Sequence, residues 1–262
     1  MPQADRSPRP DAGNVLVTGG AARIGRAIAI ALAADGWSVA LHCNRSRAAA
    51  EATVAEIEKS GGRAAVVLAD LADPGALAGL VPAAARAIGP LTALVNNASV
   101  FERDEIDDLT EESWQRHIDV NLKAPLFLAQ AFAAQRPAGR PGNIINLTDQ
   151  RVFRLTPHFV SYTVSKVGLH ALTQTLAMAL APDIRVNAIA PGPTLASTRQ
   201  SAAQFEKQRR STPLRRGADP EDIAAGIRYI LAAGSMTGQT IALDGGQHLP
   251  WPPPNGQEAH DE

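Results

Sequence analysis

The sequence predicts a single α/β domain with a doubly wound parallel sheet of seven strands. Short apolar stretches that are typical of buried strands alternate with helical stretches along nearly the whole chain. The strand-like stretches are almost continuously apolar, as expected for a sheet that helices cover on both faces. No internal repeat and no convincing linker interrupts this alternation, so we predict one domain.

The elements follow from the alternation in chain order. "NVLVTGG" is apolar enough for a buried first strand, and "ARIGRAIAIALAADG" is typical of a helix that Gly36 ends. The same reasoning predicts strands over 14–20, 38–44, 63–70, 92–98, 142–149, 184–191 and 239–246. It predicts helices over 22–36, 46–60, 74–88, about 158–181 and 220–233, helical segments over roughly 110–136 and a polar stretch over 193–216. Ligands bind at the carboxyl ends of the strands in such sheets, so functional residues should follow the strands.

Composition excludes several classes of function. The 262 residues are 45% hydrophobic and 19% charged, which suits a globular domain with a substantial core. A formal charge of −1 gives no attraction to nucleic acid or to an anionic membrane. No apolar run approaches the roughly 20 residues that a membrane span needs. Cys43 is the only cysteine, so no disulfide forms within the chain.

The two ends differ in composition from the rest of the chain. The first residues, "MPQADRSPRPDAG", have no apolar core, so they do not form a secretory signal, and we expect a cytoplasmic protein. We predict a disordered lead over 1–12, one domain over 13–249 and a proline-rich tail over 250–262.

A glycine-rich turn joins the first predicted strand to the first helix. "TGGAARIG" runs from Thr18 to Gly25. Its glycines allow a tight turn and close approach of the backbone to a ligand, and the helix N-terminus offers free N–H groups to a pyrophosphate. Glycine loops alone are a weak signal, and an ordinary turn of small residues is the alternative.

The end of the second predicted strand favours NADP(H) over NAD(H). An NAD site often has a carboxylate here for the ribose 2′-hydroxyl, but this chain has Asn44, Arg45 and Ser46. Arginine pairs well with a phosphate, although Arg45 could also be a solvated residue that opens a helix. Asp70, at the end of the third strand, could accept from the adenine amine or cap the following helix.

A tyrosine and a lysine lie four residues apart on the helix predicted over 158–181. Tyr162 and Lys166 therefore share one helical face, and Asp149 precedes the tyrosine by thirteen residues. A fixed ammonium favours tyrosinate and lowers the phenol pKa, which gives a proton donor that works near neutral pH. By spacing alone such a pair is more often ordinary surface composition than a catalytic site.

Six motifs together resemble the short-chain dehydrogenase/reductase family. They are "TGGAARIG" (18–25), "NNAS" (96–99), "VNLKAP" (120–125), "YTVSK" (162–166), "NAIAPGPT" (187–194) and "LDGG" (243–246), in the family's order. The resemblance covers about residues 13 to 249. It implies a Rossmann-type fold, a nicotinamide cofactor and usually a homotetramer.

The resemblance also implies roles for individual residues. Tyr162 would be the proton donor, Lys166 would bind the nicotinamide ribose, and Asn121 would hold a water in a proton relay. The residues that would bind the cofactor are Thr18, Gly19, Arg23, Ile24, Gly25, Asn44, Arg45, Ser46, Asp70, Leu71, Asn97, Ala98, Ser99, Tyr162, Lys166, Pro191, Gly192 and Thr194. Of these, Pro191, Gly192 and Thr194 would lie by the nicotinamide amide and the pyrophosphate.

Two positions depart from the usual family pattern. Arg23 stands in the turn where a small residue is usual, and Asp149 stands where a serine usually polarises a carbonyl oxygen. Both departures resemble the pteridine reductase branch, which includes bacterial dihydromonapterin and dihydrofolate reductases of the FolM type. Phe101 in "NNASVF" matches an aromatic residue that stacks on the pterin, and "HCNRS" and "LDGGQHL" are also similar to that branch.

The chemistry of these departures is consistent with a pterin. An ionised Asp149 would repel the oxyanion that develops on a ketone, whereas it can accept from the ring N–H and amino groups of a pterin. A ring C=N bond needs a hydride on carbon and a proton on nitrogen, which Tyr162 could supply directly or through water. Arg23 could donate to a ring atom, and Phe101 and the nicotinamide would sandwich the ring. The substrate set is therefore Arg23, Ser99, Phe101, Asp149 and Tyr162.

Alternatives remain at each of these positions. Arg23 could serve only the pyrophosphate, Phe101 could be a lid or core residue, and Asp149 could be a lost catalytic group. The segment 193–216 would cover the substrate, and its "KQRR" could meet an anionic tail or form a solvated helix face. No histidine shows the spacing of metal ligands, so no metal is expected.

We therefore expect an NADPH-dependent reductase of a pterin or dihydropterin. A carbonyl or 3-oxoacyl reductase of the same family is the first alternative. A non-catalytic NADPH-binding regulatory protein is the second, although a pure binder needs no proton donor.

Overall fold

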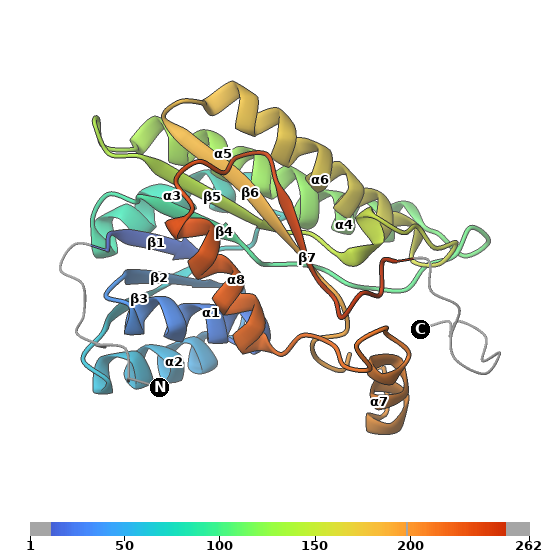
Figure 1. Cartoon of the computed structure of the whole chain (residues 1–262). Helices are drawn as coiled ribbons and strands as arrows, with labels where there is room; N and C mark the ends of the chain where they lie inside the picture. The colour runs from blue at the N-terminus through green and yellow to red at the C-terminus, as the bar shows by residue number, and fades with distance from the viewer. Residues whose placement is uncertain (1–11, 198, 250–262) are drawn as a thin grey trace.

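The computed structural model describes residues 12–197 and 199–249 and shows one parallel sheet with helices on both faces (Figure 1). The predicted lead, apart from Ala12, and the predicted tail over 250–262 lie outside the described residues. Seven strands form the sheet: β1 (Asn14–Val17), β2 (Ser38–Cys43), β3 (Arg63–Leu68), β4 (Ala93–Asn96), β5 (Gly142–Leu147), β6 (Ile184–Pro191) and β7 (Thr240–Leu243). Their order is β3-β2-β1-β4-β5-β6-β7, which confirms the predicted α/β fold.

The helices divide between the two faces of the sheet. The α-helices are α1 (Arg23–Ala34), α2 (Arg47–Lys59), α3 (Pro74–Ile88), α4 (Glu111–Ile118), α5 (Ala124–Gln135), α6 (Val160–Leu180), α7 (Ala202–Arg210) and α8 (Pro220–Ala232). Residues of α1, α2 and α8 pack in one hydrophobic cluster, and residues of α3, α5 and α6 pack in another. The sheet lies between these two clusters.

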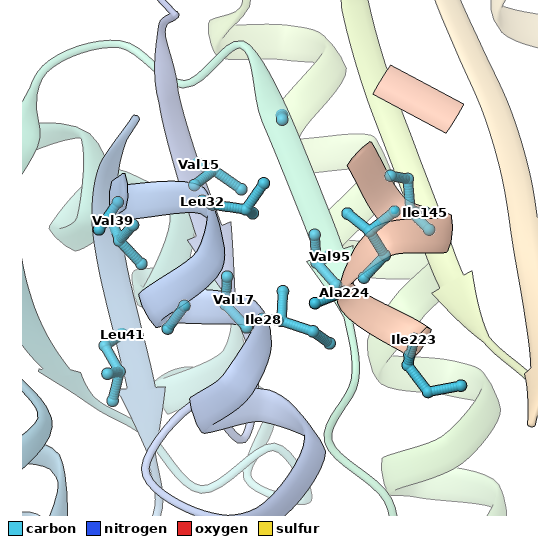
Figure 2. Packing of buried hydrophobic residues seen from close by; sticks show 14 of the residues in the cluster. Val15, Val17, Ile28, Leu32, Val39, Leu41, Val95, Ile145, Ile223 and Ala224 are labelled. Atoms are coloured by element: carbon cyan, nitrogen blue, oxygen red, sulfur yellow. The ribbon is translucent and has the colours of Figure 1, made fainter. Parts of the chain in front are cut away.

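Alternation along the strands sends side chains into both clusters. Val15 and Val17 of β1 face the cluster that contains Ile28 of α1 and Ile223 of α8, as Figure 2 shows. Leu16, between the two valines, packs in the opposite cluster. All five side chains are buried, and each contributes roughly 1.5–3 kcal/mol relative to an exposed position. Strands buried on both faces explain why the sequence shows nearly continuous apolar runs.

The strand and helix predictions are confirmed in kind but differ at the boundaries. Only β6 has the predicted bounds among the strands; the others end one to three residues earlier, because the polar residues that follow them form loops at the cleft. The helical segments predicted over roughly 110–136 are α4 and α5, with a π-helix, η1 (Asp119–Lys123), between them. The polar stretch 193–216 contains α7, so the basic residues of "KQRR" lie on a helix.

Local signals explain where two helices begin. The Asp73 carboxylate accepts a hydrogen bond from the Ala76 N–H at 2.7 Å, and Pro74 occupies the first turn of α3. At the start of α8, Pro220 occupies the first turn and the Asp222 carboxylate accepts from the Asp219 N–H at 3.0 Å. Within the described part of the chain, none of the helices is both long enough and apolar enough to cross a membrane.

Candidate active site

A cleft opens at the carboxyl ends of the central strands and encloses about 850 Å³, including solvent at its mouth. It lies where the strand order reverses between β1 and β4, which is the usual ligand site of such sheets. Residues that follow five different strands line it, among them Arg23, Asn97, Asp149, Tyr162, Gly192 and Gln247. These residues are far apart in the sequence, and parallel pairing brings them together.

The glycine turn between β1 and α1 has a conformation that only glycine fits well. Gly19 has φ +63°, and a Cβ on Gly25 would lie 2.1 Å from the Gly19 carbonyl oxygen. The first residues of α1 have no side-chain cap at Ala22. Their N–H groups and the positive end of the helix dipole therefore face the cleft end of the sheet, so the turn fits a pyrophosphate.

Hydrogen bonds join this turn to the loop that follows β4. The Thr18 hydroxyl accepts from the N–H groups of Asn97 at 2.9 Å and Ala98 at 3.0 Å, and the Asn97 amide donates to the Thr18 carbonyl at 2.8 Å. The predicted residues of the loops after β1 and β4 thus form one unit. Their backbone is held before any ligand binds.

His42, at the end of β2, was missed by the sequence analysis. Its Nδ1 accepts from the Gly19 N–H at 3.2 Å, so Nε2 must be the protonated nitrogen that donates to the Ala69 carbonyl at 3.1 Å. Burial lowers the pKa of His42, which keeps the ring neutral. The imidazole therefore joins the glycine turn to the end of β3; it has no spacing that would have indicated this role.

The predicted adenosine-side residues lie at the ends of β2 and β3, outside the residues that line the cleft. Asn44, Arg45 and Ser46 are exposed. Among the described residues, Arg45 has no ion pair or side-chain hydrogen bond, so its guanidinium is available to an anion. Asp70 accepts from the Ala72 N–H at 3.0 Å, whereas Leu71 is buried in the core.

Asp149 and Tyr162 contact each other directly. The Tyr162 hydroxyl donates to Asp149 Oδ2 at 2.9 Å, and the other carboxylate oxygen accepts from the Arg151 N–H at 2.8 Å. Asp149 stands at the end of β5 as the cap of a 3₁₀ turn, η2 (Gln150–Val152). The carboxylate therefore points into the cleft and toward the phenol, as the sequence analysis requires.

Lys166 is buried one helical turn from Tyr162. Its Nζ donates to the Leu147 carbonyl at 2.8 Å and lies 5.7 Å from the centre of the Tyr162 ring. Burial lowers the pKa of Lys166 from 10.5 to about 8, and the nearby Asp149 carboxylate opposes that shift. Lys166 is thus still mostly protonated at neutral pH, but it loses its proton at a lower pH than an exposed lysine does.

Asn121 lies in the π-helix η1 and is 1% exposed. Its amide accepts from the Val100 N–H at 2.8 Å, and its Nδ2 donates to the Val100 carbonyl at 2.9 Å and to the Ser165 hydroxyl at 3.1 Å. π-turns within helices are frequent at functional sites because they reorient one side chain. Here the side chain joins the loop after β4 to the helix of Tyr162.

Phe101 has aromatic neighbours that the sequence did not indicate. Its ring stacks on Phe159, with centroids 4.8 Å apart and planes 5° apart, and it meets Tyr162 edge-on at 4.7 Å. The guanidinium of Arg151 lies 5.1 Å from the Phe159 centroid, and that of Arg199 lies 5.5 Å from the Phe101 centroid. Phe101 lines the cleft, but Phe159 covers one face of its ring.

Arg23 contacts the segment that follows β6. This residue has φ +54°, which is uncommon outside glycine, and its guanidinium donates to the Ala196 carbonyl at 2.9 Å and the Leu195 carbonyl at 3.2 Å. Arg23 and Ile24 both line the cleft. The arginine thus joins the glycine turn to the 193–216 segment.

The end of β6 closes the opposite side of the cleft. A Cβ on Gly192 would lie 2.7 Å from the Asp244 Cα, so glycine lets β6 and β7 approach closely. The buried Thr194 hydroxyl donates to the Gly192 carbonyl at 3.1 Å. Pro191, Gly192, Thr194 and Ser99 line the cleft as expected, and Gln200, Phe205 and Gln208 line it from the segment 193–216. Gln150, Arg151 and Gln247 also line it, although the sequence analysis did not single them out. Among the described residues, no group of three His, Cys, Asp or Glu side chains could hold a metal ion.

Comparisons with known proteins agree with this geometry. A family model described as enoyl-(acyl carrier protein) reductase matches residues 19–248. The crystal structure of FolM alternative dihydrofolate reductase 1 from Brucella canis, complexed with NADP, is 50% identical, with a TM-score of 0.90, over 93% of this chain and 97% of that chain. A short-chain dehydrogenase from Burkholderia cenocepacia in complex with NADP is 36% identical, with a TM-score of 0.83, over 88% and 96%. The 3-oxoacyl-[acyl-carrier-protein] reductase of Synechocystis is 34% identical over 88% of this chain and 95% of that protein.

The Gly25→Ala variant should lose both stability and cofactor binding. Its Cβ would meet the Gly19 carbonyl oxygen and the Asn97 amide, so we expect a loss of about 1–3 kcal/mol in the free energy of unfolding. Urea unfolding and a fluorescence titration with NADPH measure the two effects. Gly79→Ala is the matched control, because it adds a methyl group to open space on α3 and should be neutral or stabilising. Normal NADPH affinity in Gly25→Ala would contradict a cofactor role for the turn.

Reduction should slow as the pH rises through about 8. The lowered pKa of Lys166 means that its ammonium loses its proton in this range, and with it the positive charge beside Tyr162. Asp149→Asn removes the carboxylate that opposes the shift, so the falling limb should move to lower pH. The measurement is kcat/KM for NADPH against pH, since it reports ionisations of the free enzyme. An unmoved limb in Asp149→Asn would show that Lys166 does not set it.

Proposed function

The chain belongs to the short-chain dehydrogenase/reductase family, and we propose that it is an NADPH-dependent reductase of a pterin or dihydropterin. The observation that carries the substrate is the hydrogen bond from the Tyr162 hydroxyl to Asp149 Oδ2. The 50% identity to an alternative dihydrofolate reductase supports the same class of substrate.

The cofactor of this oxidoreductase is NADP(H), in agreement with the NADP complexes of its relatives. The N-terminus of α1, which has no side-chain cap, and the glycine turn fit the pyrophosphate of this cofactor. The exposed Arg45 fits its 2′-phosphate. When bound, NADPH supplies a hydride to the substrate. We assign the nicotinamide end to the region around Lys166, Asn97 and Gly192, which line the cleft together.

Asp149 makes the proton-donating end of the site selective. The carboxylate holds the Tyr162 hydroxyl by accepting a hydrogen bond from it at 2.9 Å. A ketone would place a developing oxyanion beside this negative charge, which is unfavourable, whereas a pterin would place N–H donors there. The proton on Tyr162 can then pass to a ring nitrogen, directly or through water, while a ring carbon receives the hydride.

The flat ring would bind between Phe101 and the nicotinamide. Phe159 covers one face of Phe101, so only the opposite face remains for a ligand to stack on. Arg23 uses two of its five N–H donors on the Leu195 and Ala196 carbonyls, so the others could donate to the ring or to the pyrophosphate. Ser99, which is exposed at the cleft, completes the proposed substrate set.

We assign the segment 193–216 to covering the bound substrate. Ser197, Gln200, Phe205 and Gln208 from this segment line the cleft, and α7 has no buried residue among those described. Elements with few buried contacts open most easily, so α7 is suited to move when ligands enter.

We also propose that the enzyme is a homotetramer, as the family resemblance implies. Leu126 and Phe127 of α5 are 40% and 46% exposed, and Val164 of α6 is 44% exposed. Exposed apolar groups on neighbouring helices are typical of an interface with a second copy. Sedimentation of a monomer at micromolar concentration would contradict this assembly.

A cytoplasmic location stays a prediction from the sequence, which cell fractionation would test.

A carbonyl or 3-oxoacyl reductase is the second candidate. The similarity to the 3-oxoacyl-[acyl-carrier-protein] reductase of Synechocystis favours it. Asp149 would then have to be tolerated beside the substrate oxygen or be protonated during turnover.

NADPH oxidation with dihydromonapterin, dihydrofolate, biopterin and a panel of ketones and 3-oxoacyl thioesters tests the proposed function. We expect turnover of at least one pterin and of no ketone at a comparable rate. In Asp149→Ser the ratio of ketone to pterin kcat/KM should rise at least about tenfold, which corresponds to about 1.4 kcal/mol of transition-state stabilisation. Unchanged ketone activity in Asp149→Ser, or no pterin turnover in the natural protein, would reject the pterin assignment.

Arg45→Ala should weaken discrimination between the two nicotinamide cofactors. Loss of a charge-assisted contact to the 2′-phosphate should raise KM for NADPH about tenfold and leave KM for NADH nearly unchanged. Arg47→Ala is the matched control, because Arg47 is exposed two residues further on and pairs with Glu51 at 3.4 Å. Equal effects of the two substitutions would place the 2′-phosphate elsewhere.

A further inference from the structure

The helix that carries Tyr162 and Lys166 begins without a cap of its own. The residue before α6, Phe159, has a left-handed backbone with φ +57°, and its side chain makes no capping hydrogen bond. The first N–H groups of a helix need acceptors from elsewhere when they are buried. Ser161 is fully buried, so its N–H cannot rely on water.

Asp104 supplies these acceptors from the loop that follows β4. Its backbone carbonyl accepts from the N–H groups of Phe159 at 3.0 Å and Val160 at 3.4 Å. Its carboxylate Oδ1 accepts from the Ser161 N–H at 3.1 Å. One residue thus accepts hydrogen bonds from three successive N–H groups directly before Tyr162.

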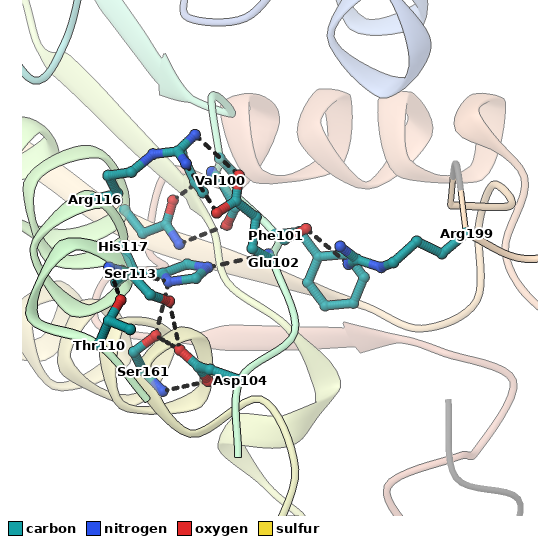
Figure 3. A network of polar contacts seen from close by, with 12 residues as sticks. Val100, Phe101, Glu102, Asp104, Thr110, Ser113, Arg116, His117, Ser161 and Arg199 are labelled. Carbon is teal, nitrogen blue, oxygen red and sulfur yellow. Dashed lines mark hydrogen bonds and ion pairs between the residues drawn. The ribbon is translucent and has the colours of Figure 1, made fainter. Parts of the chain in front are cut away.

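The second carboxylate oxygen extends this contact to α4. Asp104 Oδ2 accepts from the Ser113 hydroxyl at 2.8 Å and from the Ser161 hydroxyl (Figure 3). Burial by itself would raise the pKa of Asp104, but the hydrogen bonds from Ser161 and Ser113 outweigh it, and the pKa lies below its ordinary value. A buried carboxylate held in this way is ionised at neutral pH and complements the positive end of the α6 dipole.

His117 completes the network on the side of Tyr162. Its Nε2 accepts from the Glu102 N–H at 3.1 Å, so the proton is on Nδ1, which faces the Ser113 carbonyl at 2.9 Å and the Ser161 hydroxyl at 2.7 Å. Burial lowers the pKa of His117, which keeps the ring neutral. The ring meets Tyr162 edge-on, with centroids 6.0 Å apart.

We propose that Asp104 is a positioning residue for the reduction: it fixes the start of α6, and with it Tyr162, against the 97–104 loop that carries Ser99 and Phe101. Phe101 also contacts the Tyr162 ring, and the Val100 backbone is held by Asn121. Two walls of the cleft therefore share one anchor. This inference rests on the proposed reductase activity but not on the choice of a pterin as substrate.

The test compares Asp104→Ala and Asp104→Asn with Glu102→Gln. Glu102 is in the same loop and pairs with Arg116 at 2.9 Å, with side chains 39% and 51% exposed, so Glu102→Gln removes a carboxylate without touching α6. For each variant we measure kcat with whichever substrate the natural protein reduces, together with Kd and binding stoichiometry for NADPH. Hydrogen–deuterium exchange of segments 97–104 and 159–166 is measured as a readout that needs no turnover.

We expect kcat to fall about a hundredfold in Asp104→Ala, because a displacement of about 1 Å in a reacting group costs this much. Asp104→Asn keeps one acceptor for the Ser161 N–H, so its kcat should fall only about tenfold. Both should bind NADPH at full stoichiometry with Kd within about threefold of the natural protein, and both should exchange faster in the two segments. Glu102→Gln should match the natural protein throughout.

Three results would overturn the inference. One is a kcat for Asp104→Ala equal to that of Glu102→Gln. Another is a decrease in kcat of both Asp104 variants that is no larger than their decrease in NADPH binding stoichiometry. The variants would then contain less folded protein, and the effect would be one of stability. If the natural protein reduces neither pterin nor ketone, the proposed function fails separately. Unchanged exchange in 97–104 and 159–166 in Asp104→Ala would then reject the positioning role.

Discussion

Parallel pairing of β1 with β4 is the constraint on which the site depends. This pairing places the ends of two strands that are distant in the sequence side by side, with Val17 opposite Val95. The loops that follow are then close enough for Thr18 to accept from the Asn97 and Ala98 N–H groups. Because the loops brace each other, the glycine turn keeps a shape that a methyl group on Gly25 would destroy. Parallel β5 and β6 bring Asp149 and Gly192 to the same edge of the sheet.

The sequence predicted those parts of the site that local patterns encode. Each of three features can be recognised within a short stretch of sequence: the glycine turn, the spacing of Tyr162 and Lys166, and the aspartate at position 149. The structure brings these residues to one cleft. The sequence did not reveal contacts that depend on how separate elements pack. Phe159 stacks on Phe101 across a gap of 58 positions, and nothing near either residue indicates the other. The same is true of His42, whose role comes from the carbonyl of Ala69 and the N–H of Gly19 in space. The π-helix at Asp119–Lys123 was not predicted within the helical segments over 110–136, because a π-turn leaves no composition signal.

Two carboxylates near Tyr162 have different tasks because their partners differ. Asp149 accepts from the Tyr162 hydroxyl, pairs with Arg151 at 3.4 Å and lines the cleft, so in the proposed reaction its charge would act on the reacting groups. Asp104 is buried, and all of its described partners are hydroxyl and N–H groups at the starts of two helices. Its charge is therefore used in holding backbone and side chains in place. A carboxylate that is saturated with donors in this way has little capacity left to accept a substrate proton.

The pKa of Lys166 depends both on burial of its ammonium and on the charge of Asp149. Its ammonium is desolvated, and its pKa falls to about 8, while Asp149 provides the opposing charge that limits the fall. Replacing the carboxylate by a neutral serine would remove this charge and lower the pKa of Lys166 further. The aspartate thus affects both members of the proposed catalytic pair, since it accepts from the Tyr162 hydroxyl and favours the charged form of Lys166. A substrate that brings its own N–H donors to Asp149 preserves this balance, whereas one that brings an oxyanion adds a second negative charge beside it.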